Sequence, residues 1–403
     1  MTLGIVYHMP FWRDADGTLR EREGSFARYV DSLAPYFDQI SLCVPLLTEP
    51  AGAGTPVRAS NVTLAPLPMF DGPVQFYPRI GAVFPRLVRW VRSVDVLHCR
   101  VPTPAAVFAF TVARWLGRPA FLLVVGDLRA LFPSMPYRGI KRLLWRAYTA
   151  FEERNVQWMA DRALTFANGP ALAAKHSRPG RAAVETRTTT IDERDIASRS
   201  DTSTATRVRA LAVSRIDPRK GLAVLPAAIR QVVDAGVDCT LDIIGPTVGA
   251  PGERERDEIL QQCQHQGIGE RVSFLGAVPL EHLLPMYALY DVFVLPTLPG
   301  EGIPRVLLEA MSAGLPVVTT RTAGIPGLVQ HETNGLLVDE PSPAAVAAAM
   351  LRVVRDGELR RRLIANGYAT ARSHTLQAQA ARMMAAVERE LRLPLRSAAV
   401  AAR

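Results

Sequence analysis

Short apolar runs alternate with longer amphipathic segments along the second half of this chain. The runs are rich in Val, Ile, Leu and Ala, and glycine, proline or polar residues bound them. Unbroken apolar runs are typical of parallel strands buried on both faces, and the amphipathic segments between them are typical of helices. The predicted strands are 209–213, 239–244, 291–296 and 315–320. The pattern therefore predicts βαβ units in an open, parallel α/β sheet.

The first half has the same alternation and predicts a separate α/β domain. Its expected strands are 3–7, 40–44, 94–97, 120–125 and 163–166. Residues 178–207 are rich in Thr, Ser, Arg and Asp and have little apolar periodicity, so we place the domain boundary there. The expected organisation is an N-terminal domain over 1–190, a second domain over 208–374, an amphipathic helix over 375–392 and a flexible tail over 393–403.

Composition limits the class of protein. The chain has 403 residues, of which 48% are hydrophobic and 21% charged, which is typical of a globular α/β protein with two domains. Its net charge of +9 favours phosphate-rich substrates, anionic lipid or nucleic acid. No helix-turn-helix, zinc-finger or RNA-recognition pattern is visible, so we expect no nucleic-acid partner.

Cysteine usage and the termini point to a cytoplasmic protein. The four cysteines are scattered and contain no Cys-x-x-Cys pair, so the sequence predicts neither a disulfide framework nor a zinc site. No signal peptide and no apolar run of about 20 residues is present, so we expect no membrane-spanning helix.

Two glutamates, with seven residues between them, follow one of the predicted strands. Glu301 falls in the loop that follows residues 291–296, and Glu309 falls in the helix that Pro304 begins. Because open α/β sheets bind ligands at the carboxyl ends of their strands, both carboxylates are expected to border a ligand site. The alternative is a solvated helix face, since Glu is a good helix former.

A basic loop follows another strand of the same sheet. Arg215, Arg219 and Lys220 surround the start of the helix expected over 222–235. A helix N-terminus already carries roughly half a positive charge, so such a cluster favours an anion, and a diphosphate fits. The alternative is a solvated basic turn.

Together these loops resemble a known family. The segments Ser-Arg-Ile-Asp-Pro-Arg-Lys-Gly (214–221), Gly-Ala-Val-Pro-Leu (276–280) and Glu-Gly-Ile-Pro-Arg-Val-Leu-Leu-Glu-Ala-Met (301–311) resemble, in order and spacing, the donor site of GT-B retaining glycosyltransferases of family 4. The resemblance implies an α/β fold of the GT-B type. That fold has two Rossmann-like domains with parallel sheets that face a central cleft, and a C-terminal helix that crosses back to the N-terminal domain.

The resemblance also implies roles in binding a nucleotide-diphosphate sugar. Arg215 and Lys220 are expected to bind the diphosphate, and Glu309 the ribose hydroxyls. Glu301 is the expected catalytic carboxylate beside the transferred sugar. The adjoining segment is expected to hold the sugar and phosphates; it consists of Gly302, Ile303, Pro304 and Arg305.

The N-terminal half matches the family less closely. Gly24 and Ser25 occupy the position of a loop near the donor phosphates, although the usual double glycine is missing. His98 corresponds to a histidine that contacts the sugar or acceptor, and Arg100 replaces a second histidine, which suits a charged acceptor. Asp127 is a further candidate for acceptor binding. The alternatives are a plain turn at Gly24 and a structural histidine at position 98.

The predicted activity is transfer of a hexose-type sugar, with retention, to a hydroxyl acceptor in polysaccharide, lipopolysaccharide or glycolipid biosynthesis. No metal and no other cofactor is expected, because the basic loop supplies the positive charge. The alternatives are a sugar-nucleotide epimerase of the same shape and a non-catalytic sugar-nucleotide-binding subunit.

Two basic, aromatic segments, 77–92 and 137–146, suggest peripheral contact with an anionic membrane at the inner face of the cell membrane. We favour the first segment, because Arg86, Arg89 and Trp90 share a helical face. The alternative for both segments is the solvated face of an ordinary helix.

Overall fold

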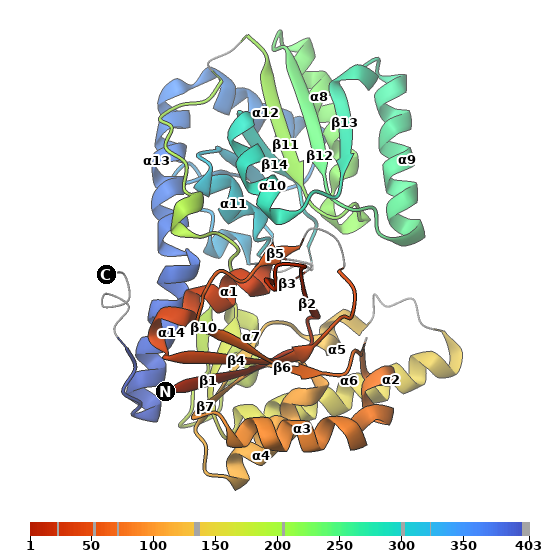
Figure 1. Ribbon diagram of the computed structural model, residues 1–403. Coiled ribbons are helices and arrows are strands. Elements are labelled where there is room, and N and C mark those ends of the chain that lie inside the picture. The colour runs from red at the N-terminus through yellow and green to blue at the C-terminus, as the bar shows by residue number, and fades with distance from the viewer. Residues whose placement is uncertain are drawn as a thin grey trace. The chain divides into compact units, whose positions relative to one another are not determined.

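A computed structural model describes residues 1–21, 24–50, 54–70, 72–132, 138–203, 206–299, 303–322 and 324–396. The chain forms two compact units (Figure 1). Unit 1 contains Met1–Thr188 and Gln377–Arg403, and unit 2 contains Thr189–Leu376. The division falls two residues before the expected end of the first domain. Residues 189–190, which we placed in the first domain, and residues 191–207, which we assigned to neither domain, belong to unit 2.

Unit 1 is built on a seven-stranded sheet in the order β10-β9-β8-β7-β1-β4-β6, and each adjacent pair is parallel. Its strands are β1 (Thr2–Val6), β4 (Gln39–Pro45), β6 (Val62–Leu67), β7 (Val96–Val101), β8 (Ala120–Val124), β9 (Leu164–Asn168) and β10 (Val184–Thr186). From β1 the chain proceeds first to β4 and β6 on one side and then to β7 through β10 on the other. The strand order therefore reverses between β1 and β7, which is where open α/β sheets bind ligands.

Helices cover both faces of this sheet. They are α1 (Ser25–Leu33), α2 (Gly72–Phe76), α3 (Ile80–Arg92), α4 (Pro104–Trp115), α5 (Leu128–Leu131), α6 (Gly139–Ala160), α7 (Pro170–His176) and α14 (Leu376–Leu391). Along β7, Leu97, Cys99 and Val101 pack into the apolar core beneath α3, α4 and α6. The alternate residues His98 and Arg100 face the layer of α1, because successive strand side chains point to opposite faces.

A small antiparallel sheet in unit 1 was not predicted. It joins β2 (Phe11–Arg13), β3 (Leu19–Glu21) and β5 (Thr55–Pro56) in the segments around α1. Trp12 from this sheet is fully buried, so the insertion has its own apolar packing. Residues 11–21, between β1 and α1, therefore contribute two strands to a small sheet rather than a simple loop.

Unit 2 contains a six-stranded parallel sheet in the order β13-β12-β11-β14-β15-β16. The strands are β11 (Val208–Val213), β12 (Cys239–Ile244), β13 (Val272–Gly276), β14 (Val292–Leu295), β15 (Val317–Thr320) and β16 (Leu336–Val338). The four strands predicted in this half are all present within a few residues. The order reverses between β11 and β14, so the two loops singled out in the sequence follow the two strands at this switch point.

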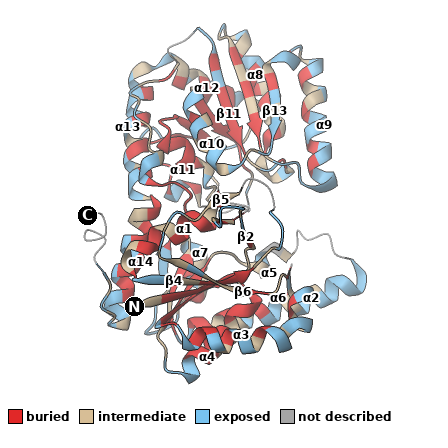
Figure 2. Cartoon of the chain, viewed as in Figure 1, coloured by how far each residue is buried: buried red, intermediate tan, exposed pale blue. Residues whose placement is uncertain are grey.

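The helices of unit 2 lie on both faces of its sheet (Figure 1). They are α8 (Leu225–Asp234), α9 (Gly249–His265), α10 (Leu280–Met286), α11 (Val306–Ser312), α12 (Pro343–Arg355) and α13 (Gly357–Ser373). Strand residues of β11, β12, β14 and β15 are almost all buried (Figure 2). This burial explains why these strands have apolar runs without alternation.

The C-terminal helix α14 belongs to unit 1, although unit 2 precedes it in the chain. Its buried residues include Met383 and Val387, and the Gln379 side-chain amide lies 3.4 Å from the Thr186 hydroxyl. Of the expected tail, residues 393–396 are described, and the Arg396 backbone N–H donates to the Tyr36 carbonyl. The rest of the tail lies outside the described residues.

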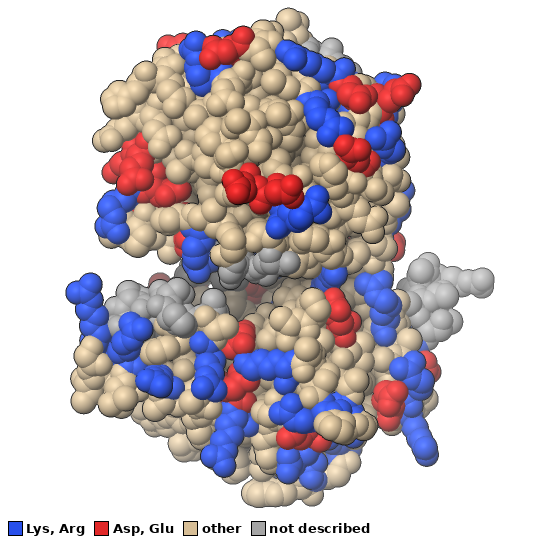
Figure 3. Space-filling view, turned by 180° about the vertical axis from the view of Figure 1, so that it is seen from behind, with Lys and Arg blue, Asp and Glu red and all other residues tan. Residues whose placement is uncertain are grey.

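The two units differ in charge. Unit 1 contains 28 Lys and Arg against 16 Asp and Glu, a formal charge of +12, whereas unit 2 contains 19 against 22, a charge of −3. Figure 3 shows many Lys and Arg side chains over unit 1 on the face that it draws. The positive excess of the chain is therefore a property of unit 1. Among the described residues, no helix is both long and apolar enough to cross a membrane.

Candidate functional site

The basic loop after β11 is held in place by its own aspartate. Asp217 precedes a short 3-10 helix (Pro218–Lys220), and its side chain accepts the backbone N–H of Arg219 at 3.0 Å. It also forms an ion pair with the Arg219 guanidinium at 2.6 Å, and this hydrogen bond lowers the pKa of Asp217 to about 2. Residues 214–221 keep a net charge of +2, because Asp217 offsets only one of three cations.

The two loops at the switch point touch each other. The Leu298 backbone N–H, which follows β14, donates to the Arg219 carbonyl at 2.9 Å. Gly221 ends the 3-10 helix with φ of +66°, and a Cβ there would lie 2.0 Å from the carbonyl oxygen of Pro296. Only glycine permits this approach. The structure therefore brings the basic loop against the loop that leads to Glu301, as the sequence predicted.

Two hydroxyl groups near these loops had no predicted role. Ser214 Oγ follows β11 and Thr297 Oγ1 follows β14, and both are buried without a hydrogen-bond partner among the described residues. Buried polar atoms are normally hydrogen-bonded, so each exception calls for an explanation. A hydroxyl after a strand is a weak signal in a sequence, which is why neither residue was singled out.

The acidic partner of the site, Glu309, lies on α11 and is almost fully buried. One carboxylate oxygen accepts the Thr190 hydroxyl at 2.5 Å, and the other accepts the Tyr287 hydroxyl at 2.7 Å. Burial and the Glu309 carboxylate together raise the pKa of Tyr287 well above its usual value. Each carboxylate oxygen can accept a further hydrogen bond, so Glu309 keeps the capacity to bind a ribose hydroxyl. That contact stays a prediction.

Part of the predicted donor segment cannot be compared, because Glu301 and Gly302 lie outside the described residues. Ile303 is half-buried, and its Cγ1 atom lies 2.7 Å from where a Cβ on Gly324 would be. Arg305 is exposed and immediately precedes α11. Pro304 and Arg305 accept backbone hydrogen bonds from the first turn of α11. The segment therefore forms the start of the helix, as its proline indicated.

In unit 1, the start of α1 is capped by a buried carboxylate. Gly24 has the left-handed conformation, with φ of +79°, and precedes Ser25 at the first position of the helix. The Glu21 carboxylate accepts the backbone N–H groups of Phe26 and Ala27 at 3.2 and 3.3 Å. These two amide donors are occupied by the protein itself. Any phosphate contact at Gly24 and Ser25 stays a prediction and does not involve those two donors in this conformation.

His98 is a buried residue in this structure and not a surface ligand. Its side chain has no exposed surface, its ring stacks on Phe121 at 4.4 Å, and its Nε2 lies 2.9 Å from the Tyr29 hydroxyl. Burial, with the nearby Arg100 charge, lowers the pKa of His98 to about 3. The expected direct contact with a sugar is therefore not supported, because a fully buried ring does not reach one. The alternative of a structural histidine fits the geometry.

Arg100 lies two residues further along β7 and is buried among aromatic rings. The guanidinium carbon lies 4.8 Å from the ring centre of Tyr7, 5.1 Å from that of Phe26 and 4.9 Å from that of Tyr29. Only 7% of the residue is exposed. Nε and Nη1 are buried, and the described part of the chain offers them no hydrogen-bond partner. The predicted contact with an acceptor stays open.

Asp127 has structural contacts that account for its position. Its side chain accepts the backbone N–H groups of Arg129 and Ala130, both at 3.0 Å, and so caps α5. It also pairs with Lys175 at 2.7 Å, and Lys175 pairs with Glu153 at 2.8 Å. The predicted role in acceptor binding stays a prediction, since these contacts leave the carboxylate 23% exposed.

Glu152 of unit 1 is a further buried polar side chain. Within the described residues, its Oε2 has no hydrogen-bond partner, and burial raises the pKa of this carboxyl on α6 to about 7.

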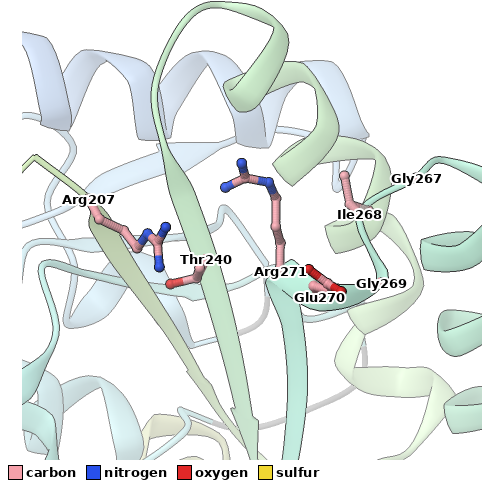
Figure 4. Close-up of a pocket in the computed structure, with 7 residues that line it drawn as sticks. All are labelled: Arg207, Thr240, Gly267, Ile268, Gly269, Glu270 and Arg271. Carbon is pink, nitrogen blue, oxygen red and sulfur yellow. The ribbon is translucent and has the colours of Figure 1, made fainter.

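A polar hollow lies at the opposite edge of the unit 2 sheet, at the start of β11, β12 and β13 (Figure 4). Its arginines, Arg207 and Arg271, both pair with Asp238, so the hollow differs from the donor loops in place and charge.

The membrane contact predicted for segment 77–92 required an exposed Trp90, and the structure buries this side chain. Trp90 is 5% exposed and donates its ring N–H to the Ser41 hydroxyl, whereas Arg86 and Arg89 border a groove beside β6. A buried indole cannot enter a bilayer, so this helix lacks the apolar anchor that we expected.

Comparison with known proteins decides the family of the second unit. Residues 194–370 match the family described as glycosyl transferases group 1. This segment belongs to the group 1 glycosyltransferases. A putative colanic acid biosynthesis glycosyltransferase of Escherichia coli is 37% identical over 148 residues, which are 36% of this chain and 35% of that protein. The D-inositol 3-phosphate glycosyltransferase of Corynebacterium jeikeium is 36% identical over 37% of this chain and 35% of that protein. The match thus spans about a third of the curated relatives' length.

Solved structures extend the likeness beyond this segment to the whole fold. HepE of Anabaena, solved with UDP and glucose, superposes with a TM-score of 0.64 at 19% identity. The superposition covers 96% of this chain and 99% of that one. The structure has the GT-B fold that the sequence predicted.

Proposed function

We propose that this chain is a glycosyltransferase that moves a sugar from a nucleoside-diphosphate sugar to a hydroxyl group of a glycan or glycolipid. The observation that carries the proposal is the loop of residues 214–221. It has a net charge of +2 and follows β11 at the switch point of the sheet, in contact with the loop after β14. A diphosphate is the ligand that this position and charge favour.

Arg215 and Lys220 are the proposed partners of the leaving diphosphate. Arg215 is exposed and Lys220 is half-buried. Negative charge on the diphosphate grows as its bond to the sugar breaks, so fixed cations stabilise the transition state more than the bound donor. In this proposal no metal takes part, because these side chains supply the positive charge.

The two glutamates have different proposed roles. Glu309 binds the ribose hydroxyls from α11, and Glu301 positions the transferred sugar and stabilises positive charge at its anomeric carbon. Retention of configuration and a hexose-type sugar follow from the resemblance to family 4 enzymes. The relatives support the class of acceptor, since their names include colanic acid biosynthesis and D-inositol 3-phosphate as an acceptor.

The deciding experiment removes the Lys220 charge. We expect Lys220→Ala to lower donor turnover by at least about tenfold, which is roughly 1.4 kcal/mol of transition-state stabilisation. The measurement is release of nucleoside diphosphate from a panel of UDP-, GDP-, ADP- and dTDP-sugars, first screened by thermal shift. Arg219→Ala is the matched control, because this cation of the same loop is already paired with Asp217.

Wild-type turnover in Lys220→Ala would contradict the assignment. The same assay with and without an acceptor separates the alternatives. An epimerase converts the donor without an acceptor, and a binding subunit gives a thermal shift but no turnover. The relatives named above are glycosyltransferases, which favours neither alternative.

A further inference from the structure

A buried arginine in unit 1 has no anionic partner among the residues that the structure describes. Arg100 is more than nine-tenths buried, and its Nε and Nη1 have no hydrogen-bond partner within the residues described. Within the described residues, no carboxylate lies within ion-pair distance of it. The three surrounding rings attract the positive charge, but their faces do not accept its N–H groups as oxygen atoms do.

The buried acidic residue at the start of α1, Glu21, is hydrogen-bonded to the backbone. Glu21 is fully buried, and its carboxylate accepts two backbone N–H groups at the start of α1. One of those donors belongs to Phe26, whose ring also lies over Arg100. Glu21 therefore stabilises the helix N-terminus, and no ion pair joins it to Arg100 in the described part of the chain. An unpaired buried charge is costly, and proteins keep such groups where a ligand completes the pair.

The position of Arg100 is that of a ligand site. It lies near the carboxyl end of β7, and Tyr7 follows the carboxyl end of β1, the neighbouring strand. The strand order of unit 1 reverses between these two strands. Beside them, His8 Nδ1 lies 2.9 Å from the Thr103 hydroxyl, so polar groups continue along the same edge. Unit 1 also carries the formal charge of +12.

We propose that Arg100 binds an anionic group, a phosphate or a carboxylate, that the acceptor carries. This inference rests on the proposed transferase function and names the class of its second substrate. The planar guanidinium matches either anion with two parallel hydrogen bonds, which a histidine at this position would not provide. A neutral glycan would leave the buried charge uncompensated and would bind more weakly.

The test measures thermal stabilisation of the full chain by inorganic phosphate against chloride at equal ionic strength. The Arg215→Gln/Lys220→Ala background removes the basic loop, so the remaining response reports on unit 1. We expect saturable stabilisation in that background and its loss when Arg100→Gln is added. Arg162→Gln is the matched control, because Arg162 is an exposed arginine of unit 1 that also lies over an aromatic ring.

Two further measurements test whether the anion belongs to the acceptor or to the donor. Glucuronate and glucose 6-phosphate should stabilise the wild type at lower concentrations than glucose, and Arg100→Gln should abolish the difference. The affinity for the nucleoside diphosphate should stay within about twofold in Arg100→Gln. A fall of about tenfold would place the anion on the donor and overturn the proposal, as would a phosphate response that survives Arg100→Gln.

The outcome stays interpretable if Arg100→Gln does not fold. Arg100→Lys keeps the charge but not the two-pronged shape, so phosphate should bind several-fold more weakly. Unchanged affinity in Arg100→Lys would overturn the proposal. The Lys220→Ala test of the proposed function leaves Arg100 unchanged. A failure of this inference can therefore be told apart from a failure of the proposed function.

A second inference concerns the first turns of α6, and a different observation carries it. Ile140, Leu143 and Leu144 are 74%, 65% and 63% exposed and share one face at i, i+3 and i+4 spacing. Four exposed cations surround them, namely Arg138, Lys141, Arg142 and Arg146. Segment 138–148 contains no acidic residue. Apolar residues in a basic setting complement the surface of an anionic bilayer.

We infer that this face of α6 docks on an anionic membrane. The wild type should sediment with vesicles of phosphatidylglycerol and phosphatidylcholine, but not with phosphatidylcholine alone, and salt should weaken the association. Leu143→Ser/Leu144→Ser should abolish sedimentation. Leu289→Ser, at a 57% exposed leucine of unit 2, and Arg86→Ser/Arg89→Ser should not.

Sedimentation that persists in Leu143→Ser/Leu144→Ser would overturn the inference, and so would its absence in the wild type. The same variants distinguish a second copy of the chain as the occupant. A dimer in light scattering that the leucine substitutions disperse, without any vesicle binding, would assign the face to self-association.

Discussion

At the scale of single residues, the site depends on side chains that are far apart in the sequence. Glu309 and Thr190 are separated by 119 positions, yet their hydrogen bond is among the shortest in unit 2 at 2.5 Å. Tyr287 completes the pair of hydroxyl donors on this buried carboxylate. The carboxylate is thus fixed in one orientation before any ligand arrives, which is the condition for selective binding.

Replacing this carboxylate by an amide tests its role. In Glu309→Gln one of the two hydroxyl donors faces an NH₂ group, so we expect a loss of about 1–3 kcal/mol in unfolding free energy. Donor affinity should also fall by about tenfold, or 1.4 kcal/mol. Chemical denaturation and calorimetric titration with the nucleotide provide the two measurements.

Tyr287→Phe is the matched control for this variant. It removes one hydrogen bond and keeps the carboxylate, so stability should fall while donor affinity changes little. Donor affinity equal to wild type in Glu309→Gln would show that Glu309 supports the fold and not the ligand.

At the scale of elements, the contact between the loops after β11 and β14 sets the geometry of the proposed donor site. Gly221 is the residue that permits it, since its backbone is left-handed and the Pro296 carbonyl occupies the space of a Cβ. The hydrogen bond from Leu298 to Arg219 holds the loops in register.

Gly221→Ala should separate the two loops. We expect a loss of roughly 1–3 kcal/mol in stability, from strain and from the displaced carbonyl, and a weaker affinity for the donor. Gly236→Ala is the control, because Gly236 also has a positive φ but no atom lies within 4 Å of its Cβ position. Equal effects of the two substitutions would show that backbone strain alone, and not the loop contact, is responsible.

The elements of unit 2 could be predicted because their signals are local. Apolar runs mark β11, β12, β14 and β15, and the glycine and proline around α11 mark its start. The position of the basic loop beside the Glu301 loop followed from the rule for strand ends. The partners of Glu309 could not be found in this way, because tertiary packing alone brings Thr190 and Tyr287 to it.

Unit 1 was harder to predict, for physical reasons that are visible in particular residues. The sheet of β2, β3 and β5 is made of very short strands with little periodicity. Trp90 and the arginines near it have the spacing of an amphipathic face, but an indole also fills space beside a sheet. His98 resembles a ligand in sequence, although aromatic neighbours from α1 and β8 bury it.

At the scale of the whole molecule, stability depends on pH through Glu152. Burial raises the folded-state pKa to about 7, from the ordinary value of 4.5. The folded protein therefore binds more protons than the unfolded chain between these values. Stability should fall as pH rises from about 4.5 to about 7, and the loss is complete above that range.

Glu152→Gln should remove this dependence. At pH 8 we expect the free energy of unfolding of the variant to exceed that of the wild type by at most about 3 kcal/mol. At pH 4.5 the two free energies of unfolding should be nearly equal. The measurement is the melting temperature between pH 4.5 and 8.5, with the exposed Glu49→Gln as control. A parallel pH profile in wild type and Glu152→Gln would contradict the assignment.

The return of α14 to unit 1 has a consequence for how the protein is made. A ribosome releases the chain from its N-terminus, so the strands of unit 1 emerge first and wait for a helix near residue 391. Unit 2 is contiguous from residue 189 to 376 and can fold while that helix is still being synthesised. The part of the chain that is translated first is therefore completed last. A premature stop before α14 should damage unit 1, at the N-terminal end of the chain, and not unit 2, in which the stop occurs.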